Sequence, residues 1–287
     1  MTTRHVSIDG RVTGVVGFLL VLVVYFAVNH WVDTAVPAEP ELVRNAVEAV
    51  WFLGFAAIGA VFLYRDDASP SDIGLAKRFL LPGAIAFLAV WVGLNVVGVG
   101  IATASGNAWG LDVLWPVALG GLVASFGYAF VEEFVVRGYL QNKVRSVLGA
   151  NGWVSRGTAI VVAGALFGLA HVPRVLVEGG YVSGTSVVGT LLVLTLSGVG
   201  FGLVYELTEN LYFVGLLHGL GNTWPLLVDG FTWDGTAKTA FFVAIGVTYF
   251  GIVGVYRRVT ARTSVTPRVR VTPGGATTDR RATDSSR

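Results

Sequence analysis

Long apolar runs separated by short polar segments dominate the pattern along the chain. Several runs approach or exceed about 18–20 residues, the length that a helix needs to cross a hydrocarbon core of about 30 Å. The pattern predicts eight spans, at residues 12–31, 45–64, 79–101, 113–136, 157–172, 185–205, 210–228 and 238–256. We therefore expect an all-α fold, a polytopic transmembrane helix bundle.

The positions of lysine and arginine predict how these spans are oriented. Most basic residues fall on one side of the predicted membrane: Arg4, Arg11, Arg65, Lys77, Arg78, Arg137, Lys143, Arg145, Arg156 and those of the C-terminal tail. Only Arg44, Arg174 and Lys238 fall on the other side. Because basic residues concentrate in cytoplasmic loops, this asymmetry predicts that both termini are cytoplasmic. The loop "YELTENLY" contains Glu206 and Glu209 but no basic residue, and favours neither side.

Composition narrows the class of protein further. The chain is 54% hydrophobic and 13% charged, which fits a multi-pass protein of the cell membrane with lipids around it. The pI of about 9.0 could suggest nucleic acid, but the excess basic charge lies at the C-terminus, where a topology signal explains it. We therefore expect no nucleic-acid partner. The absence of cysteine excludes disulfides, zinc-thiolate sites and cysteine nucleophiles.

Four segments follow from this pattern. Residues 1–112 hold predicted spans 1–3, residues 113–228 hold spans 4–7, and residues 229–256 hold span 8. The first apolar run is too long for a typical signal peptide and is predicted to be an anchor. Residues 257–287, rich in Arg, Thr, Ser, Pro and Gly, are predicted to form a disordered, basic, cytoplasmic tail.

Few polar residues interrupt the apolar runs, and they indicate where function lies. Ionisable groups at membrane depth are costly and usually face a protein interior or a wet cavity. The inventory is Glu48, Glu132, Glu133, Arg137, His171 and His218, with Asn95 and Asn222 as uncharged additions.

The segment "EEFVVR" carries two of these acids side by side. On a helix, Glu133 and Arg137 share a face, whereas Glu132 points about 100° away from Glu133. Arg137 can therefore neutralise Glu133 and leave Glu132 free. The face of Glu132 is expected to form a cavity lining with Ser125, Tyr128, Ala129, Val136 and Tyr139. The alternative is an ion-pair cluster that only anchors the helix in the membrane.

Two histidine segments, "FGLAH" at 167–171 and "HGLGN" at 218–222, complete the inventory. Glu132 and His171 lie at similar distances from a turn near Gly152, so both should reach one level and could form a general-base pair or part of a metal site. A lone histidine there could equally be a capping or interface residue. His218 and Asn222 share one helical face among glycines that serve either close approach of a substrate or packing alone.

These motifs together, in this order and on separate spans, resemble the CPBP family of intramembrane proteases. That family includes type II CAAX prenyl endopeptidases, Abi-type proteins and proteins similar to lysostaphin resistance protein A. Its pattern EExxxR, FxxxH and HxxxN is matched here by "EEFVVR", "FGLAH" and "HGLGN". The resemblance covers about residues 113–228.

The resemblance implies hydrolysis of a peptide bond in a membrane-associated protein or peptide, of which a prenylated CAAX protein is one candidate. Glu132 and His171 would activate water, His218 and Asn222 would stabilise the oxyanion, and Glu133, Arg137 and Phe167 would support them. A metalloendopeptidase holding Zn²⁺ through Glu132, His171 and His218 is the other possibility. The amide of Asn222 suits an oxyanion donor better than a zinc ligand, which favours chemistry without a metal.

Two other functions fit the same segments. A non-catalytic membrane scaffold, such as an immunity or regulatory protein on this fold, should tolerate loss of Glu132. A small transporter could use the buried acids and histidines as a proton path, but we see no pair of related halves with interrupted helices.

Overall fold

The structure, a computed structural model, is helical throughout the part of the chain that it describes. That part comprises residue 8 and residues 10–35, 41–110, 115–149, 152–178, 186–223, 228 and 233–263. The helices are α1 (Val12–Ala35), α2 (Glu41–Arg65), the 3₁₀-helix η1 (Pro70–Ile73), α3 (Lys77–Ser105), α4 (Trp115–Glu133), the π-helix η2 (Phe134–Gln141), α5 (Asn142–Val147), α6 (Trp153–Ala170), α7 (Val172–Glu178), α8 (Val187–Thr208), α9 (Leu211–Thr223) and α10 (Gly235–Thr263). These residues include no strand, so the predicted all-α class is confirmed.

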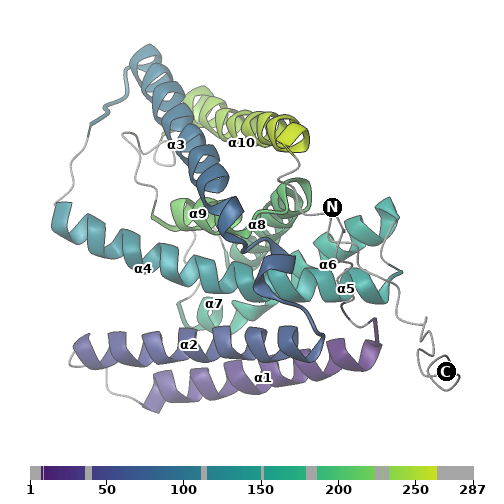
Figure 1. The fold of residues 1–287 in the computed structure, drawn as a ribbon. Coiled ribbons are helices and arrows are strands. Elements are labelled where there is room, and N and C mark those ends of the chain that lie inside the picture. The colour runs from purple at the N-terminus through teal and green to yellow at the C-terminus, as the bar shows by residue number, and fades with distance from the viewer. Residues whose placement is uncertain are drawn as a thin grey trace, which may run out of the picture.

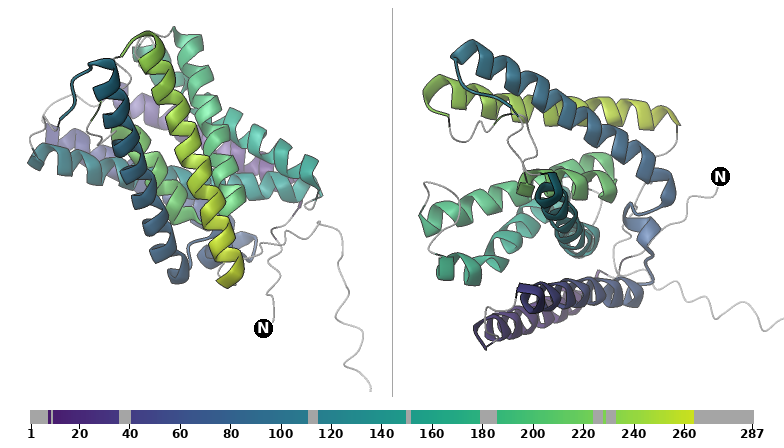
Figure 2. Two further views of the ribbon diagram at one scale, coloured as in Figure 1. Left: turned by 90° about the horizontal axis from the view of Figure 1, so that it is seen from above. Right: turned by 90° about the vertical axis from the view of Figure 1, so that its left-hand side faces the viewer.

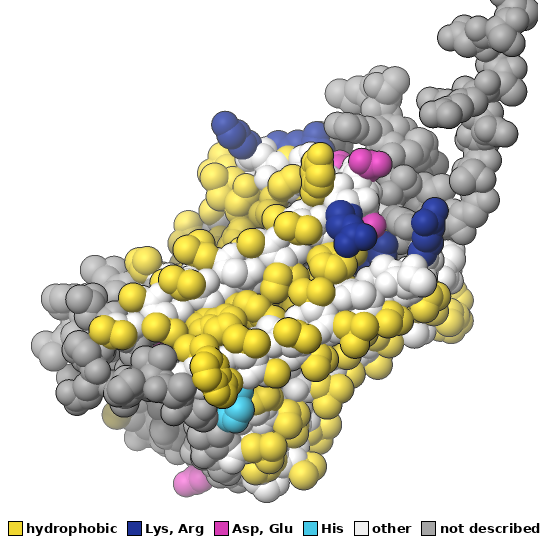
Figure 3. Space-filling view, turned by 90° about the horizontal axis from the view of Figure 1, so that it is seen from below, with side chains coloured by type: hydrophobic (Ala, Val, Ile, Leu, Met, Phe, Trp, Pro, Cys, Tyr) yellow, Lys and Arg dark blue, Asp and Glu magenta, His cyan; other side chains and the backbone are white. Residues whose placement is uncertain are grey.

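Six segments of the described chain are long and apolar enough to span a membrane. They are Val12–Val32, Ala46–Arg65, Pro70–Ser105, Trp153–Ala170, Val187–Thr208 and Gly235–Thr260. Figure 3 shows one face of the molecule covered largely by hydrophobic side chains, with Lys and Arg gathered towards one end. The chain is therefore a multi-pass membrane protein.

The eight-span count and the cytoplasmic termini remain predictions. Helices α4 and α9 correspond to the two additional expected spans, and α9 has only 13 residues, about 20 Å of helix.

At the C-terminus, α10 continues to Thr263, into the segment predicted to be a tail, because the helix does not stop at the basic residues after Tyr256. The rest of that tail prediction lies outside the described residues.

Three layers organise the bundle (Figure 1). Helices α1 and α2 form one layer, α3 and α10 pair in another, and α4 with α6 to α9 lie between them, as the right-hand view of Figure 2 shows. Within the central layer α4 packs on α9 and α6 packs on α8. The residues of all three quoted motifs lie in this central layer, which places the candidate site inside the bundle.

The helix that carries the two glutamates does not end where the sequence suggested. Instead α4 runs directly into the π-helix η2 and then into α5, so the helical run continues to Val147. Arg137, assigned to the cytoplasmic side by the sequence analysis, is fully buried inside η2. Its use as a marker of the cytoplasmic side was therefore wrong, because a charge that is paired within the bundle carries no information about a loop.

The π-helix also changes which residues lie on the same helical face as Glu132. Residues in i→i+5 turns advance by less than the α-helical step, so the 100° rule fails after Glu133. Tyr139 is buried and donates a hydrogen bond to Asp66 Oδ2 (3.1 Å), and Val136 packs with Ala163. Both were expected to line a cavity with Glu132, and that part of the prediction was wrong.

Polar side chains of η2 and α5 attach this helical run to α8. The bonds run from Arg137 Nη2 to Gly198 O (2.8 Å), from Gln141 Nε2 to Gly202 O (3.2 Å) and from Asn142 Nδ2 to Tyr205 Oη (2.9 Å). The acceptors recur at three- and four-residue intervals and therefore lie along one face of α8. Because all of these donors are buried, breaking one would leave a polar group without a partner, at a cost of about 1–3 kcal/mol.

Glycines let the central helices approach closely. A Cβ on Gly164 of α6 would lie 2.7 Å from the backbone nitrogen of Val199 in α8. On α9, a Cβ on Gly215 would lie 2.6 Å from Phe130 Cδ2, and one on Gly219 would overlap the ring of Phe126. The glycines on either side of His218 therefore serve helix packing against α4, and this packing brings His218 towards the two glutamates.

A second cluster of charges lies where α8 ends. Glu206 Oε1 pairs with Arg145 Nη1 (3.3 Å) and Arg156 Nη1 (3.4 Å). Glu209 follows in a left-handed backbone conformation, with a φ of 49°. Burial, and then repulsion by Glu206, raises the pKa of Glu209 from 4.5 to about 7, against the opposing attraction of nearby arginines.

We expect this carboxyl to make stability depend on pH. Because the folded state binds the Glu209 proton more tightly than the unfolded state, its contribution to stability is complete below about pH 4.5 and is lost as pH rises through about 7. The loss should amount to about 1–3 kcal/mol. Melting temperatures in detergent between pH 5 and pH 8 should fall with pH in the native protein and change less in Glu209→Gln. Asp234→Asn, which removes an exposed carboxylate, is the control; an identical pH slope in Glu209→Gln and native protein would contradict the assignment.

Candidate functional site

Glu133 lies at the centre of a buried polar cluster formed by α4, η2 and α9. Its Oε1 accepts hydrogen bonds from Arg137 Nη1 (2.8 Å) and from His218 Nδ1 (2.8 Å). The side chains of Glu133 and Arg137 are fully buried, and that of His218 is 6% exposed. The predicted pairing of Glu133 with Arg137 is thus present, and His218 shares the same oxygen.

Aromatic rings hold the members of this cluster in place. The ring of Phe201 stacks on His218, with centroids 4.8 Å apart and planes at 24°. Phe167 presents its face to the Arg137 guanidinium, 4.8 Å from the ring centroid, and meets His218 edge-on at 5.7 Å. These contacts and the bond to Glu133 leave the imidazole little freedom to rotate. Phe201 was missed by the sequence analysis, although it is the only aromatic residue in the run "SGVGFG".

Glu132 occupies the other side of the same imidazole. Its Oε2 lies 3.6 Å from His218 Nε2, and its side chain is 22% exposed, in contrast to the fully buried Glu133. His218 therefore lies between two carboxylates. That of Glu133 is buried and bonded to Arg137, whereas that of Glu132 is partly exposed and open to a small molecule such as water. The expectation that Glu132 is the free member of the pair agrees with this arrangement.

His171 lies at the C-terminal end of α6, close to the cluster but without a bond to it. Its Nδ1 is 2.8 Å from the carbonyl oxygen of Phe167, and its ring lies 4.7 Å from that of Phe167. Among the bonds and ion pairs of the described residues, none joins His171 to Glu132 or to His218. Phe167 stands between the two histidines and contacts both.

Asn222 lies one helical turn beyond His218, near the end of α9. Its side chain is exposed, and the described part of the chain provides no hydrogen bond to it. Its predicted role as an oxyanion donor stays a prediction, as do the individual roles of Glu132, His171 and His218.

The site does not fit a metal ion held by three protein ligands. Within the described residues, no three His, Asp or Glu side chains lie close enough together to hold one. His218 Nδ1 bonds to Glu133 and His171 Nδ1 bonds to a backbone carbonyl, so only their Nε2 atoms could coordinate, and the described residues do not bring these together with a third ligand. We therefore derive no step through a metal.

Two buried polar atoms of the cluster lack a hydrogen-bond partner among the described residues: Glu133 Oε2 and Arg137 Nε. Unsatisfied buried groups are costly, and natural proteins concentrate them at functional sites or fill them with water. The glycines beside His218 were a signal for the Glu133–His218 contact, because they mark the side of α9 where another helix comes close.

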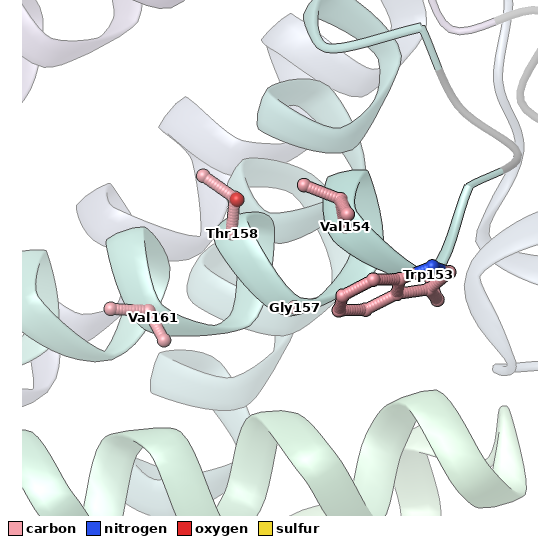
Figure 4. Close-up of a pocket in the computed structure, with 5 residues that line it drawn as sticks. All are labelled: Trp153, Val154, Gly157, Thr158 and Val161. Atoms are coloured by element: carbon pink, nitrogen blue, oxygen red, sulfur yellow. The ribbon is translucent and has the colours of Figure 1, made fainter.

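The apolar hollows of the surface carry none of the candidate residues. One, at the start of α6, is lined by Trp153, Val154, Gly157, Thr158 and Val161 (Figure 4). Another lies between α1 and α2 and is lined by apolar side chains alone. Neither is lined by an ionisable side chain that could serve in acid–base chemistry, so the polar cluster remains the candidate site.

Comparison with known proteins supports the resemblance drawn from the motifs. Residues 114–224 match the family model described as "Type II CAAX prenyl endopeptidase Rce1-like", which confirms the resemblance to the CPBP family over that segment. The match includes every residue of the polar cluster. No curated protein and no solved structure matches the chain significantly.

Proposed function

From this family match, we propose that the chain is an intramembrane endopeptidase that hydrolyses a peptide bond of a membrane-associated protein or peptide. The family indicates a protease, and hence a hydrolase. The observation that supports our choice of residues is the position of His218 between a buried carboxylate, Glu133, and a partly exposed one, Glu132. A paired carboxylate and imidazole, with one side accessible, is an arrangement suited to general-base catalysis.

In the proposed reaction Glu132 takes a proton from water as the water oxygen attacks the carbonyl carbon of the peptide bond. A C–O bond forms and the carbonyl oxygen becomes an oxyanion. The proton then passes to the leaving nitrogen as the C–N bond breaks, which restores the carboxylate. His171 would assist in activating the water. Asn222 would stabilise the oxyanion together with His218, whose Nε2 must carry a hydrogen in order to donate to it.

Glu133 gives His218 a defined role in this scheme. Because Nδ1 is held by Glu133 at 2.8 Å, Nε2 is the nitrogen that faces Glu132 and the space where a substrate would bind. A second carboxylate that orients an imidazole through its far nitrogen is a recurrent device in hydrolytic sites. Arg137 and Phe167 position Glu133 and His218 respectively, which gives each residue of the motif set a function.

A non-catalytic scaffold remains the second candidate, and a specific observation favours it. His171 and Asn222, which an active protease of this type would use, form no bond to Glu132 or His218 in the described structure. For the protease, substrate binding would have to bring these two side chains to the reacting atoms. Apo sites often have long catalytic distances that shorten in the complex.

A cleavage assay on the purified protein in detergent or lipid tests the proposal. The panel contains prenylated and unprenylated C-terminal CAAX peptides together with membrane-spanning and leader-type peptides. We expect the native protein to cleave at least one class and to keep its activity in the presence of a chelator. Loss of activity with the chelator, restored by Zn²⁺, would overturn the scheme without a metal. Equal turnover by native protein and Glu132→Gln would favour the scaffold.

A further inference from the structure

A second carboxylate, Glu48, lies within the candidate span Ala46–Arg65 of α2 and belongs to none of the family motifs. Its side chain is partly buried, and its one hydrogen bond within the described structure comes from Tyr128 Oη of α4 at 3.5 Å, the long limit for such a bond. No basic side chain whose position the structure describes pairs with it, and the side chain of Arg44 is not among those described. An ionisable group at this depth is costly and normally has a partner or a function.

Tyr128 is held so that its hydroxyl faces Glu48. Its ring stacks on Phe52 of α2 with centroids 4.0 Å apart and planes at 19°. Further along, α2 packs on η2 through Gly59, where a Cβ would lie 2.9 Å from Phe134 Cε1. The carboxylate and the hydroxyl therefore occupy a defined place between α2 and α4.

This place lies beside the exposed side of Glu132. Tyr128 and Glu132 are four residues apart in the α-helical part of α4, so they share a face about 6 Å apart. The opposite faces of α4 are covered: Phe126 and Phe130 pack on α9. The spacing of Tyr128 and Glu132 along α4 corresponds to about two residues of an extended peptide.

We propose that Glu48 and Tyr128 form a subsite for a basic side chain of the substrate, two or three residues from the bond that is cleaved. This inference rests on the proposed function and adds a substrate preference to it. The Lys or Arg of a bound peptide would supply a cation for the Glu48 carboxylate, which accepts a hydrogen bond from the Tyr128 hydroxyl. A charge-assisted hydrogen bond in a partly buried site is strong enough to discriminate between peptides.

The test is a positional set built on whichever panel peptide the native protein cleaves, with Lys, Gln or Glu at each position from second to fourth on either side of the cleaved bond. For the native protein we expect one position at which Lys raises kcat/KM by about 10–100-fold over Gln, the effect of a hydrogen bond to a charged group. Glu48→Gln should reduce that preference to less than about 3-fold while the Gln peptide is cleaved as before. Glu48→Lys should prefer Glu at the same position.

Two controls establish whether the Lys preference arises from Glu48 and from peptide binding. Arg44 precedes Glu48 by four residues, the spacing of an ion pair on a helix. An unchanged Lys preference in Arg44→Gln supports the subsite, whereas a larger preference would show that Arg44 competes for Glu48 and would assign this carboxylate to a pair within the chain. Binding of the same peptides to Glu132→Gln, followed by fluorescence, must show the same Lys preference. If peptides are cleaved but no preference depends on Glu48, the proposal of a subsite is overturned and the proposed protease function is retained. If no panel peptide is bound or cleaved, both are overturned.

Discussion

Glu132→Gln is expected to abolish peptide cleavage, lowering kcat by at least about 10³-fold, because an amide cannot accept the proton of the attacking water. The substitution preserves shape and removes only the group that lies 3.6 Å from His218 Nε2 on the open side of the ring. Since Glu132 is 22% exposed and is not bonded to Arg137, the protein should fold normally. The measurement is single-turnover cleavage of the best panel peptide, with melting temperature as the check on folding.

A matched control separates loss of a base from loss of charge. Asp67→Asn removes an exposed carboxylate from a residue with a φ of 54°, a conformation that asparagine tolerates well. It should cleave at the native rate. Native-like cleavage by a well-folded Glu132→Gln protein would show that Glu132 is not the base and would remove the mechanism proposed above.

Arg137→Ala should strongly destabilise the protein. It removes the guanidinium that bonds to Glu133 and to the carbonyl of Gly198, both at 2.8 Å, and leaves a carboxylate buried without its cation. Breaking a buried pair in this way costs about 3–5 kcal/mol. We expect a melting temperature lower by about 10 °C or more, or too little folded protein to purify.

The double variant Glu133→Gln with Arg137→Met distinguishes folding from function. Removing both charges avoids the stranded carboxylate and should recover much of the stability, because replacing a whole buried pair is often neutral. Cleavage should stay at least about 10-fold low, since a Gln side chain positions His218 less firmly. Full activity in the double variant would mean that Glu133 does not orient His218.

A second buried ion pair serves as a comparison for the pair of Glu133 and Arg137. Lys143 Nζ lies 2.8 Å from Asp66 Oδ2, with side chains 1% and 9% exposed, and this pair joins α5 to the end of α2. Lys143→Ala should destabilise the protein much as Arg137→Ala does. The double variant Asp66→Asn with Lys143→Met should retain cleavage, because neither side chain touches Glu132, Glu133 or His218. A loss of activity there would indicate that any buried pair in the bundle matters equally.

The order of the motifs and the family that they resemble could be recognised from the sequence, whereas contacts across helices could not. The four-residue spacing of Glu133 and Arg137 determines a shared face in any helix, and the predicted ion pair is present. The hydrogen bond from His218 to Glu133 joins residues 85 positions apart and depends on how closely α4 and α9 pack. The expected Glu132–His171 pair assumed two parallel axes of equal rise, which the π-helix and the crossing of the helices do not provide.

The amino-acid pattern alone predicts an apolar, all-helical membrane protein with a short inventory of costly polar residues, because hydrocarbon selects against every charge that does not have a partner or a function. The pairing of those residues depends on how the helices pack. His218 lies between Glu132 and Glu133 because the glycines of α9 let it approach the phenylalanines of α4. Arg137 stays in the interior because a carbonyl of α8 and the ring of Phe167 meet its guanidinium there. Such contacts follow from the packing of whole helices, and no local pattern of residues specifies them.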